Sequence, residues 1–339
     1  MSIKKSLYII PFFLIIITYC LGLKAENVLN IYSARQEVLI RPLIDKFESR
    51  QNIKVNIIAA KASQLINRLE QEEKYTKADI LLTVDVARLI NAKNKGVFQP
   101  IKNNKLKALI PEEFRDKDNH WFGFSLRARF IVFNKNKVKK KQLNGYMSLA
   151  ENKWKSRILV RSSNNVYNQS LVAAMLLNYG EEKTAFFLQQ FVSNFVRKPS
   201  GGDRDQIKGV ISEIGDLALV NSYYFLNMKS KDTDNLLKNL EVYFPEDKYM
   251  KTHVNISGAG IIKYSKNTKN AEKFLEYMVS DEAQKIYSSV NYEYPIIKNL
   301  KLNDFIEKYK VPNQDNLALS KIGEVNKKAI VMMDKAGWQ

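Results

Sequence analysis

Short apolar runs alternate with amphipathic segments from residue 28 onward, and this alternation limits the folds that the chain can adopt. Residues 28–32, 53–59 and 78–83 are rich in aliphatic side chains, as expected of buried strands. The segments between these runs place their apolar residues on one face of a helix, at Leu39, Ile40, Leu43, Ile44 and Phe47 and again at Leu65, Ile66 and Leu69. Strands that alternate with helices favour a mostly parallel sheet covered by helices on both faces.

The second half of the chain repeats this pattern. Apolar runs predict further strands at residues 124–133, 158–161, 217–221 and 255–264. Helical periodicity predicts helices at residues 169–178, 181–192, 203–213, 270–279 and 319–335, and a further segment at residues 281–290 follows the fourth of them. A chain of 339 residues is long enough for two hydrophobic cores, so we expect an α/β protein with two lobes and several crossings between them.

The N-terminus is typical of a secretory signal. Two lysines precede an apolar run over residues 7–21, and Ala25 offers a small residue after which cleavage would occur. The run is about 15 residues long, which is short for a membrane-spanning helix of about 20. We therefore expect a signal peptide at residues 1–25 and a periplasmic mature protein. An uncleaved anchor is the alternative, and lipid attachment at Cys20 is disfavoured because a bulky tyrosine precedes it.

The strong positive charge raises the question of a polyanionic partner. The formal net charge is +19, which is compatible with binding to nucleic acid or to an anionic surface. The lysines, however, are spread along the whole chain, and the densest run, at residues 135–141, contains no aromatic residue on which bases could stack. We interpret the lysines as a solvated surface and expect no nucleic-acid partner.

Three tyrosines follow predicted strands and are the candidate metal ligands. Tyr167 comes after the strand at residues 158–161, and the pair Tyr223-Tyr224 comes after the strand at residues 217–221. Phenolate oxygens suit a hard trivalent cation such as Fe(III). An isolated tyrosine pair is more typical of amphipathic packing. Because neighbouring residues of a regular strand point to opposite faces, both can reach one ion only if the strand has ended before them.

Seven short segments, in this order along the chain, resemble the ferric-iron-binding proteins that feed bacterial ABC importers. They are Ile31-Tyr32-Ser33-Ala34-Arg35-Gln36, Ala78-Asp79-Ile80-Leu81-Leu82-Thr83-Val84-Asp85, Trp121-Phe122-Gly123-Phe124-Ser125-Leu126-Arg127-Ala128-Arg129, Val166-Tyr167-Asn168, Asn221-Ser222-Tyr223-Tyr224, Thr252-His253-Val254-Asn255-Ile256-Ser257-Gly258 and Asn291-Tyr292-Glu293-Tyr294-Pro295. The resemblance covers essentially the whole mature chain. It implies a transferrin-like, two-lobed periplasmic-binding-protein fold, in which each lobe is a mixed sheet flanked by helices and the ligand cleft lies between the lobes.

The resemblance also implies roles for individual residues. Tyr223 and Tyr224 match the paired tyrosine ligands of the family, and Tyr167 matches a third tyrosine ligand. Arg127 matches an arginine beside the iron, where some members bind carbonate as a synergistic anion or use the guanidinium as a counter-charge. The first lobe departs from the pattern, because Gln36 and Glu37 stand where relatives often carry His-Tyr. Glu37 could bind as a carboxylate, Gln36 could offer its carbonyl or an outer hydrogen bond, or water or an anion could complete the shell.

The function implied by the resemblance is capture of Fe(III) as cargo and its delivery to an ABC permease by a monomeric periplasmic protein. We expect residues 26–128 and 253–300 to form the first lobe, and residues 129–252 and 301–339 to form the second. One alternative keeps the fold but binds an organic anion, polyamine, thiamine or sugar, and another is a charge-driven adhesion role. We do not expect an enzyme, because nucleophile-elbow, phosphate-loop and zinc-protease motifs are absent and the chain has 2 histidines.

Two further residues have predicted structural roles. Asp85 follows the third strand and is expected to cap the next helix, with a contact between the lobes as the second interpretation. His253 is expected to be a hydrogen-bonded residue of a strand or of the region between the lobes and not a metal ligand.

Overall fold

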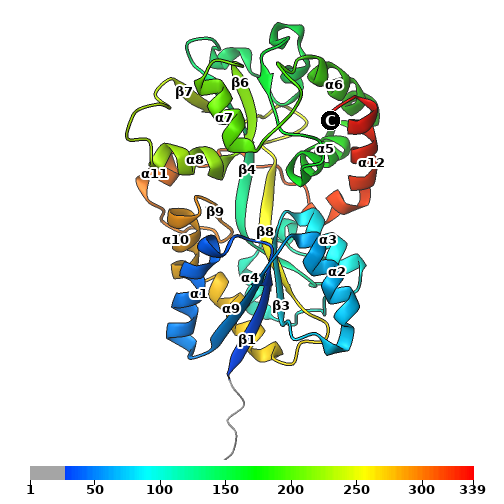
Figure 1. Cartoon of the computed structure of the whole chain (residues 1–339), viewed down its shortest axis with the longest axis vertical. Coiled ribbons are helices and arrows are strands. Elements are labelled where there is room, and N and C mark those ends of the chain that lie inside the picture. Colours follow the sequence, from blue (N-terminus) through cyan, green and yellow to red (C-terminus); the bar gives the residue numbers. More distant parts are fainter. Residues whose placement is uncertain (1–26) are drawn as a thin grey trace, which may run out of the picture.

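The computed structural model describes residues 27–339, so the predicted signal segment with Cys20 lies outside the described residues. The described chain forms two lobes joined by two long strands, β4 (Phe122–Asn134) and β8 (Val254–Ile261), which run side by side through the middle of the molecule (Figure 1). Every residue of both strands is buried. The predicted two-lobed α/β architecture is confirmed.

One mixed sheet of nine strands extends through both lobes, in the order β2-β1-β3-β8-β4-β6-β5, with β7 and β9 paired to β4. The remaining strands are β1 (Val28–Ser33), β2 (Lys54–Ala59), β3 (Ile80–Val84), β5 (Ile158–Leu159), β6 (Leu217–Asn221), β7 (Leu240–Tyr243) and β9 (Tyr294–Pro295). β1 is parallel to β2 and β3, and β5 is parallel to β6. The prediction of a mostly parallel sheet was wrong, because β4 and β8 cross between the lobes in opposite directions and pair antiparallel with their neighbours.

Helices cover both faces of the sheet in the first lobe (Figure 1). They are α1 (Glu37–Gln51), α2 (Ala62–Glu72), α3 (Val86–Asn94), α4 (Asn104–Leu109), α9 (Thr268–Met278) and α10 (Asp281–Val290). The apolar stripe predicted for α1 is buried, and its last member, Phe47, meets Phe274 of α9 edge to face with ring centroids 5.0 Å apart. Helices α1, α9 and α10 lie on one side of the sheet, and α2 and α3 lie on the other.

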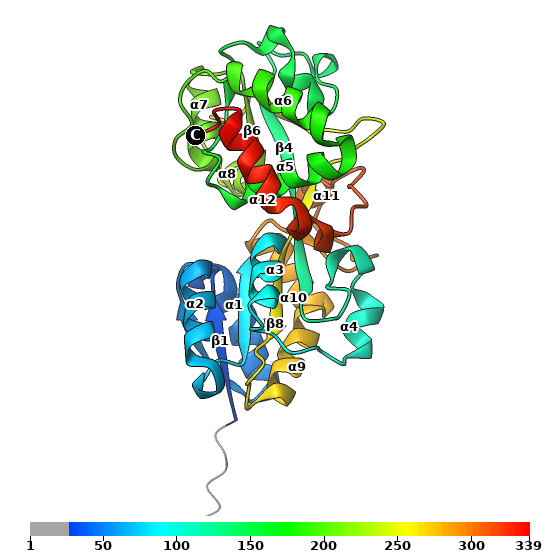
Figure 2. The ribbon, with the colours of Figure 1, turned by 90° about the vertical axis from the view of Figure 1, so that its right-hand side faces the viewer.

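The second lobe has the same layered construction. Its helices are α5 (Val166–Tyr179), α6 (Glu181–Ser193), α7 (Asp203–Ile211), α8 (Ser222–Ser230) and α12 (Ile322–Lys335), and the short α11 (Asp304–Lys308) lies near the junction of the lobes. Short 3-10 turns occupy Glu73–Tyr75, Glu112–Phe114, Lys140–Gln142, Met147–Ala150, Asn152–Trp154 and Leu319–Lys321. The C-terminal α12 packs along α5 and also reaches α3 of the first lobe (Figure 2). None of the helices within residues 27–339 combines the length and the apolar character needed to cross a membrane.

The lobe boundaries at residues 128–129, 252–253 and 300–301 stay predictions. The strand β4 continues through residue 128 without a break, so the fold offers no sharp division there, whereas residue 253 directly precedes the start of β8. This continuity places the candidate site beside the two strands, where the lobes face each other.

Candidate metal-binding site

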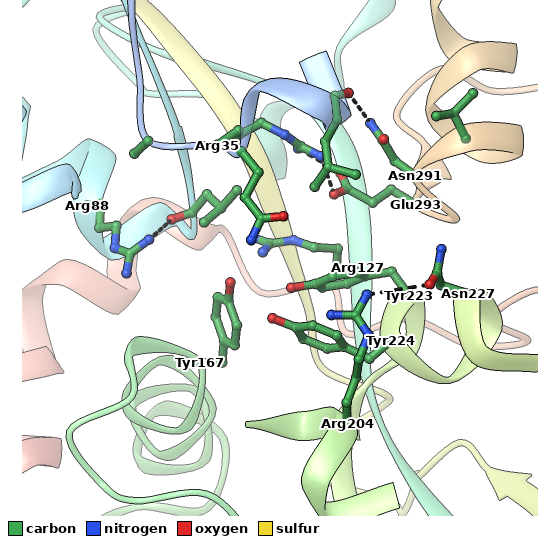
Figure 3. A pocket seen from close by; sticks show the side chains of 15 residues that line it. Arg35, Arg88, Arg127, Tyr167, Arg204, Tyr223, Tyr224, Asn227, Asn291 and Glu293 are labelled. Carbon is green, nitrogen blue, oxygen red and sulfur yellow. Dashed lines mark hydrogen bonds and ion pairs between the residues drawn. The ribbon is translucent and has the colours of Figure 1, made fainter. Parts of the chain in front are cut away.

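A cavity of about 230 Å³ lies between the lobes, next to the crossing strands. Its walls come from the β1–α1 connection, the end of β3, β4, α3 and the segment from α10 to β9, and from α5, α7 and α8 of the second lobe. The lining residues are Ala34, Arg35, Gln36, Leu39, Val84, Arg88, Arg127, Tyr167, Arg204, Tyr223, Tyr224, Asn227, Val290, Asn291 and Glu293. Tyrosine and arginine dominate the polar part of this lining (Figure 3).

The tyrosine pair lies in the first turn of a helix. β6 ends at Asn221 and α8 begins at Ser222, so the strict alternation of a strand no longer applies at Tyr223 and Tyr224. The two rings lie against each other with centroids 4.0 Å apart. Their hydroxyl groups point toward the cavity (Figure 3). The geometric condition for two adjacent tyrosines to face one ion is therefore met.

Tyr167 approaches the same space from the start of a second helix. It is the second residue of α5, and its backbone N–H donates to the capping Asn165 Oδ1 at 3.1 Å. Its hydroxyl group points toward those of the pair (Figure 3). Because α5 and α8 both begin at the cavity, the positive ends of two helix dipoles are directed toward it, which favours an anionic ligand there.

Without a cation, the tyrosine pair is held in the neutral form. Burial raises the pKa of Tyr223 well above its usual value, and the nearby Tyr167 and Tyr224 raise it further. Burial also raises the pKa of Tyr224, followed by the effects of Tyr167 and Asp203. A ligand that binds these oxygens as phenolates must therefore displace their protons, which a metal cation does by stabilising the anion.

Arg127 presents a buried positive charge beside the tyrosines. Its Nη2 donates to the Ile256 carbonyl at 2.6 Å, and its guanidinium carbon lies 5.2 Å from the centre of the Tyr167 ring. Its Nε is buried and has no hydrogen-bond partner within the described residues. Burial opposes the charge, yet Tyr167 and Glu293 raise the pKa of Arg127 above its usual value, so this residue stays a cation.

The carboxylate in the cavity wall is already paired. Glu293 Oε1 accepts from Arg35 Nη2 at 2.7 Å, and Glu293 Oε2 accepts from Arg35 Nη1 at 3.1 Å. Ser125 and Ser257 also donate to Glu293 Oε2. Burial alone would raise the pKa of Glu293, but Arg35 outweighs burial and holds this pKa below its usual range. Four donors saturate this group, so it leaves little capacity for a cation.

The family model of bacterial extracellular solute-binding proteins matches residues 75–318. The chain belongs to this family. Iron uptake protein A1 of Synechocystis is 41% identical over 317 residues, which are 93% of this chain and 88% of that protein. The structure of Trichodesmium FutA in complex with iron and citrate is 40% identical, with a TM-score of 0.87 over 92% of this chain and 100% of that one. The ferric binding protein of Campylobacter jejuni is 36% identical, with a TM-score of 0.85 over 92% and 100% of the two chains.

These comparisons confirm the resemblance to ferric-iron-binding proteins. Solute-binding proteins of transporters are not a class of enzymes. In this solute-binding protein, the structure brings five of the predicted site residues together at the cavity, namely Gln36, Arg127, Tyr167, Tyr223 and Tyr224.

The two first-lobe candidates have different positions. Gln36 lines the cavity and is exposed. Glu37 does not line the cavity, because its carboxylate pairs with Arg41 one helical turn along α1 and the side chain is exposed to solvent. The first lobe therefore offers two groups at the cavity, the Gln36 amide and the Glu293 carboxylate, which is already paired with Arg35. Glu37 is not directed toward the tyrosines.

Sequence reasoning missed most of the charged lining. Arg88 donates to the Val84 carbonyl at 3.3 Å, and the guanidinium carbon of the exposed Arg204 lies 4.9 Å from the centre of the Tyr224 ring. Arg35 and Glu293 both occur in the segments that carry the family resemblance, and that signal could have identified them. Arg88 lies near the start of α3 and Arg204 near the start of α7. No sequence pattern distinguishes these two arginines from arginines on the surface.

A second group of metal-ligating side chains lies away from the cavity. Asp116, Asp118 and His120 place ligand atoms within 4.8 Å of one another. Lys93 Nζ already binds both carboxylates, at 2.8 Å from Asp116 Oδ1 and 2.7 Å from Asp118 Oδ2. The ammonium group of Lys93 therefore already supplies the positive charge that the carboxylates of Asp116 and Asp118 require.

Proposed function

We propose that this solute-binding protein captures Fe(III) in the cleft between its lobes and delivers it to an ABC permease. The observation that carries the proposal is the convergence of the Tyr167, Tyr223 and Tyr224 hydroxyls on one cavity (Figure 3). Relatives that cover almost the whole chain support it, because their names describe iron uptake and ferric binding. Three phenolates supply hard anionic oxygen, which is what a trivalent cation prefers.

The charges around the cavity favour an anion that accompanies the metal. Three phenolates neutralise Fe(III), while Arg88, Arg127 and Arg204 form no ion pair with a carboxylate within residues 27–339. An anion such as carbonate or a carboxylate would balance part of this excess through charge-assisted hydrogen bonds. With Glu37 turned away, this anion, water or the Gln36 amide completes the coordination shell.

The working cycle follows from the family. Extracellular solute-binding proteins of this family act with ABC transporter permeases. We infer a monomeric carrier in the periplasm that presents its loaded form to the permease. The same fold with an organic anion, polyamine, thiamine or sugar as cargo is not favoured by the iron-related relatives.

The test is to load the purified mature protein with ferric citrate, remove excess iron by gel filtration, and record the visible spectrum and the iron content. Ferric phenolate gives a charge-transfer colour, so we expect a visible band and about one iron per protein. The Y223F/Y224F variant should lose both. The matched control is Y264F, which removes the hydroxyl of a tyrosine that is 42% exposed and does not line the cavity. A colourless wild-type protein without iron would contradict the proposal.

A further inference from the structure

One buried carboxylate outside the cavity joins the segments that carry all three tyrosines. Asp203 is the first residue of α7 and is 0% exposed. Its Oδ1 accepts from Arg129 Nη1 at 2.8 Å, and its Oδ2 accepts from Arg161 Nη1 at 2.7 Å. Asp203 does not line the cavity, although the next residue, Arg204, does.

The first connection runs to the tyrosine pair. Asp203 Oδ1 also accepts from the backbone N–H of Asn221 at 3.0 Å. Asn221 is the last residue of β6, and the helix with Tyr223 and Tyr224 begins at the following residue. The carboxylate thus fixes the point at which the chain changes from strand to helix, and this change turns both tyrosines toward the cavity.

The second connection runs to Tyr167. Arg161, held by Asp203, places its guanidinium carbon 5.7 Å from the centre of the Tyr167 ring. Arg129, held by the same carboxylate, donates through Nη2 to Asn168 Oδ1, and Asn168 is the neighbour of Tyr167 in α5. Asn168 Nδ2 in turn donates to the Arg161 carbonyl at 3.0 Å. These contacts form a closed network of charged and amide groups behind the Tyr167 ring.

We propose that Asp203 is a positioning residue that sets the spacing between Tyr167 and the Tyr223-Tyr224 pair, so that the second lobe holds the three oxygens ready for the metal. This inference rests on the proposed function. One carboxylate connects the helix start of the pair to two arginines that hold the segment around Tyr167. Groups that orient metal ligands in this way typically contribute about 10- to 100-fold to metal affinity.

The test compares D203N with D205N in the full mature protein. The D203N substitution retains the size of the side chain and one acceptor oxygen. It removes the negative charge that holds Arg129 and Arg161. Asp205 is the matched control, because it lies in the same first turn of α7, is exposed, and accepts from the Gly202 backbone N–H at 2.7 Å. The readouts are the Fe(III) affinity in competition with citrate, the position and intensity of the phenolate-to-iron band, and the thermal unfolding midpoint.

We expect D203N to bind Fe(III) about 10- to 100-fold more weakly and to show a shifted or weakened band, while D205N behaves as the wild type. A lower unfolding midpoint in D203N with unchanged affinity and band would show a merely structural role and would overturn the inference. A wild-type protein that shows no band would refute the proposed function itself, so the two failures are distinguishable.

A second variant keeps the test decisive if D203N does not fold. R161Q removes the cation near the Tyr167 ring but leaves the bonds from Asp203 to Arg129 and to Asn221 in place. The Arg161 side chain is 20% exposed, so R161Q should destabilise the fold less than the loss of the fully buried Asp203 carboxylate does. A weaker affinity with a shifted band supports the inference, and a spectrum and affinity identical to the wild type contradict it.

Discussion

Ser170 Oγ donates a hydrogen bond of 2.7 Å to Asp85 Oδ1, and this bond joins α5 of the second lobe to the start of α3 in the first. Both side chains are fully buried. Asp85 Oδ1 also accepts from the Ala87 backbone N–H at 3.0 Å, and its Oδ2 accepts from Asn255 Nδ2 at 3.0 Å. The predicted capping role of Asp85 is confirmed, and the same carboxylate also makes the contact between the lobes.

Replacing Ser170 with Ala should destabilise the protein. The variant removes one donor from a buried carboxylate, and a lost partner of this kind costs about 1–3 kcal/mol. We expect the free energy of unfolding in urea to fall by that amount, with an unchanged m-value. The control is S193A, since the exposed Ser193 donates only within its own helix end, to the Gln190 carbonyl. Equal stabilities for S170A and the wild type would show that this contact contributes nothing.

Bound iron should release protons from the tyrosines. Burial raises the pKa of Tyr223 and Tyr224, so both are neutral at pH 7 and each loses a proton when it binds as a phenolate. Iron affinity should therefore fall as the pH falls, because protons compete for the same oxygens. Calorimetry in two buffers of different ionisation enthalpy measures the number of protons released per iron. Y224F should release about one proton fewer than the wild type, and Y264F should release the same number.

The candidate site could be predicted in part because its tyrosines occupy informative positions. Tyr167 and the pair Tyr223-Tyr224 each follow an apolar run, and the end of a strand is visible in the sequence. Glu37 shows the limit of this reasoning. Gln36 and Glu37 are neighbours at the start of α1, where successive side chains point about 100° apart, so one lines the cavity and the other does not. Which of the two faces the second lobe depends on tertiary packing.

The fold could be predicted to the level of its elements but not of its strand directions. The apolar run at residues 217–221 coincides with β6, and most other predicted strands and helices agree with the structure within a few residues. The antiparallel pairing of β8 with β3 could not be read from the sequence, since it depends on the chain leaving the first lobe through β4 and returning through β8. Apolar composition reports burial of a strand, not its direction.

His253 should make the protein sensitive to acid. Burial, followed by the charges of Arg129 and Arg127, lowers the pKa of His253 to about 3. An unfolded histidine takes up a proton near pH 6.5. Between these two values the unfolded chain binds a proton that the folded chain does not, so this residue makes the protein less stable as the pH falls from about 6.5 toward 3. Its contribution between pH 7 and pH 5 is about 2 kcal/mol.

Urea unfolding at pH 7 and pH 5 checks this prediction. The difference in the free energy of unfolding between the two pH values should be about 2 kcal/mol smaller in H253Q than in the wild type. The control is H120Q, because His120 is partly exposed and contacts Asp116 at 3.1 Å. If H253Q and the wild type lose the same stability on acidification, His253 takes up its proton in the folded state.

The contact between α12 and α3 should not tolerate a larger residue at Gly323. A Cβ atom at this position would lie 2.4 Å from Ile90 Cγ2, so either the Ile90 side chain or one of the two helices must shift. Alanine improves the intrinsic helix stability by about 1 kcal/mol relative to glycine. Overpacking in a close contact costs about 1–3 kcal/mol. Since the stiff, β-branched Ile90 cannot easily move aside, we expect the overpacking to dominate and G323A to be less stable than the wild type.

A double-mutant cycle separates the two contributions. I90A alone removes the close contact, so G323A introduced into the I90A background should be neutral or stabilising, in contrast to its effect in the wild type. The expected coupling between the two substitutions is about 1 kcal/mol or more. The control K327A alters an exposed position of the same helix and should change the free energy of unfolding by less than about 0.5 kcal/mol. Additive effects of G323A and I90A would mean that the contact between α12 and α3 adapts to the added methyl group without strain.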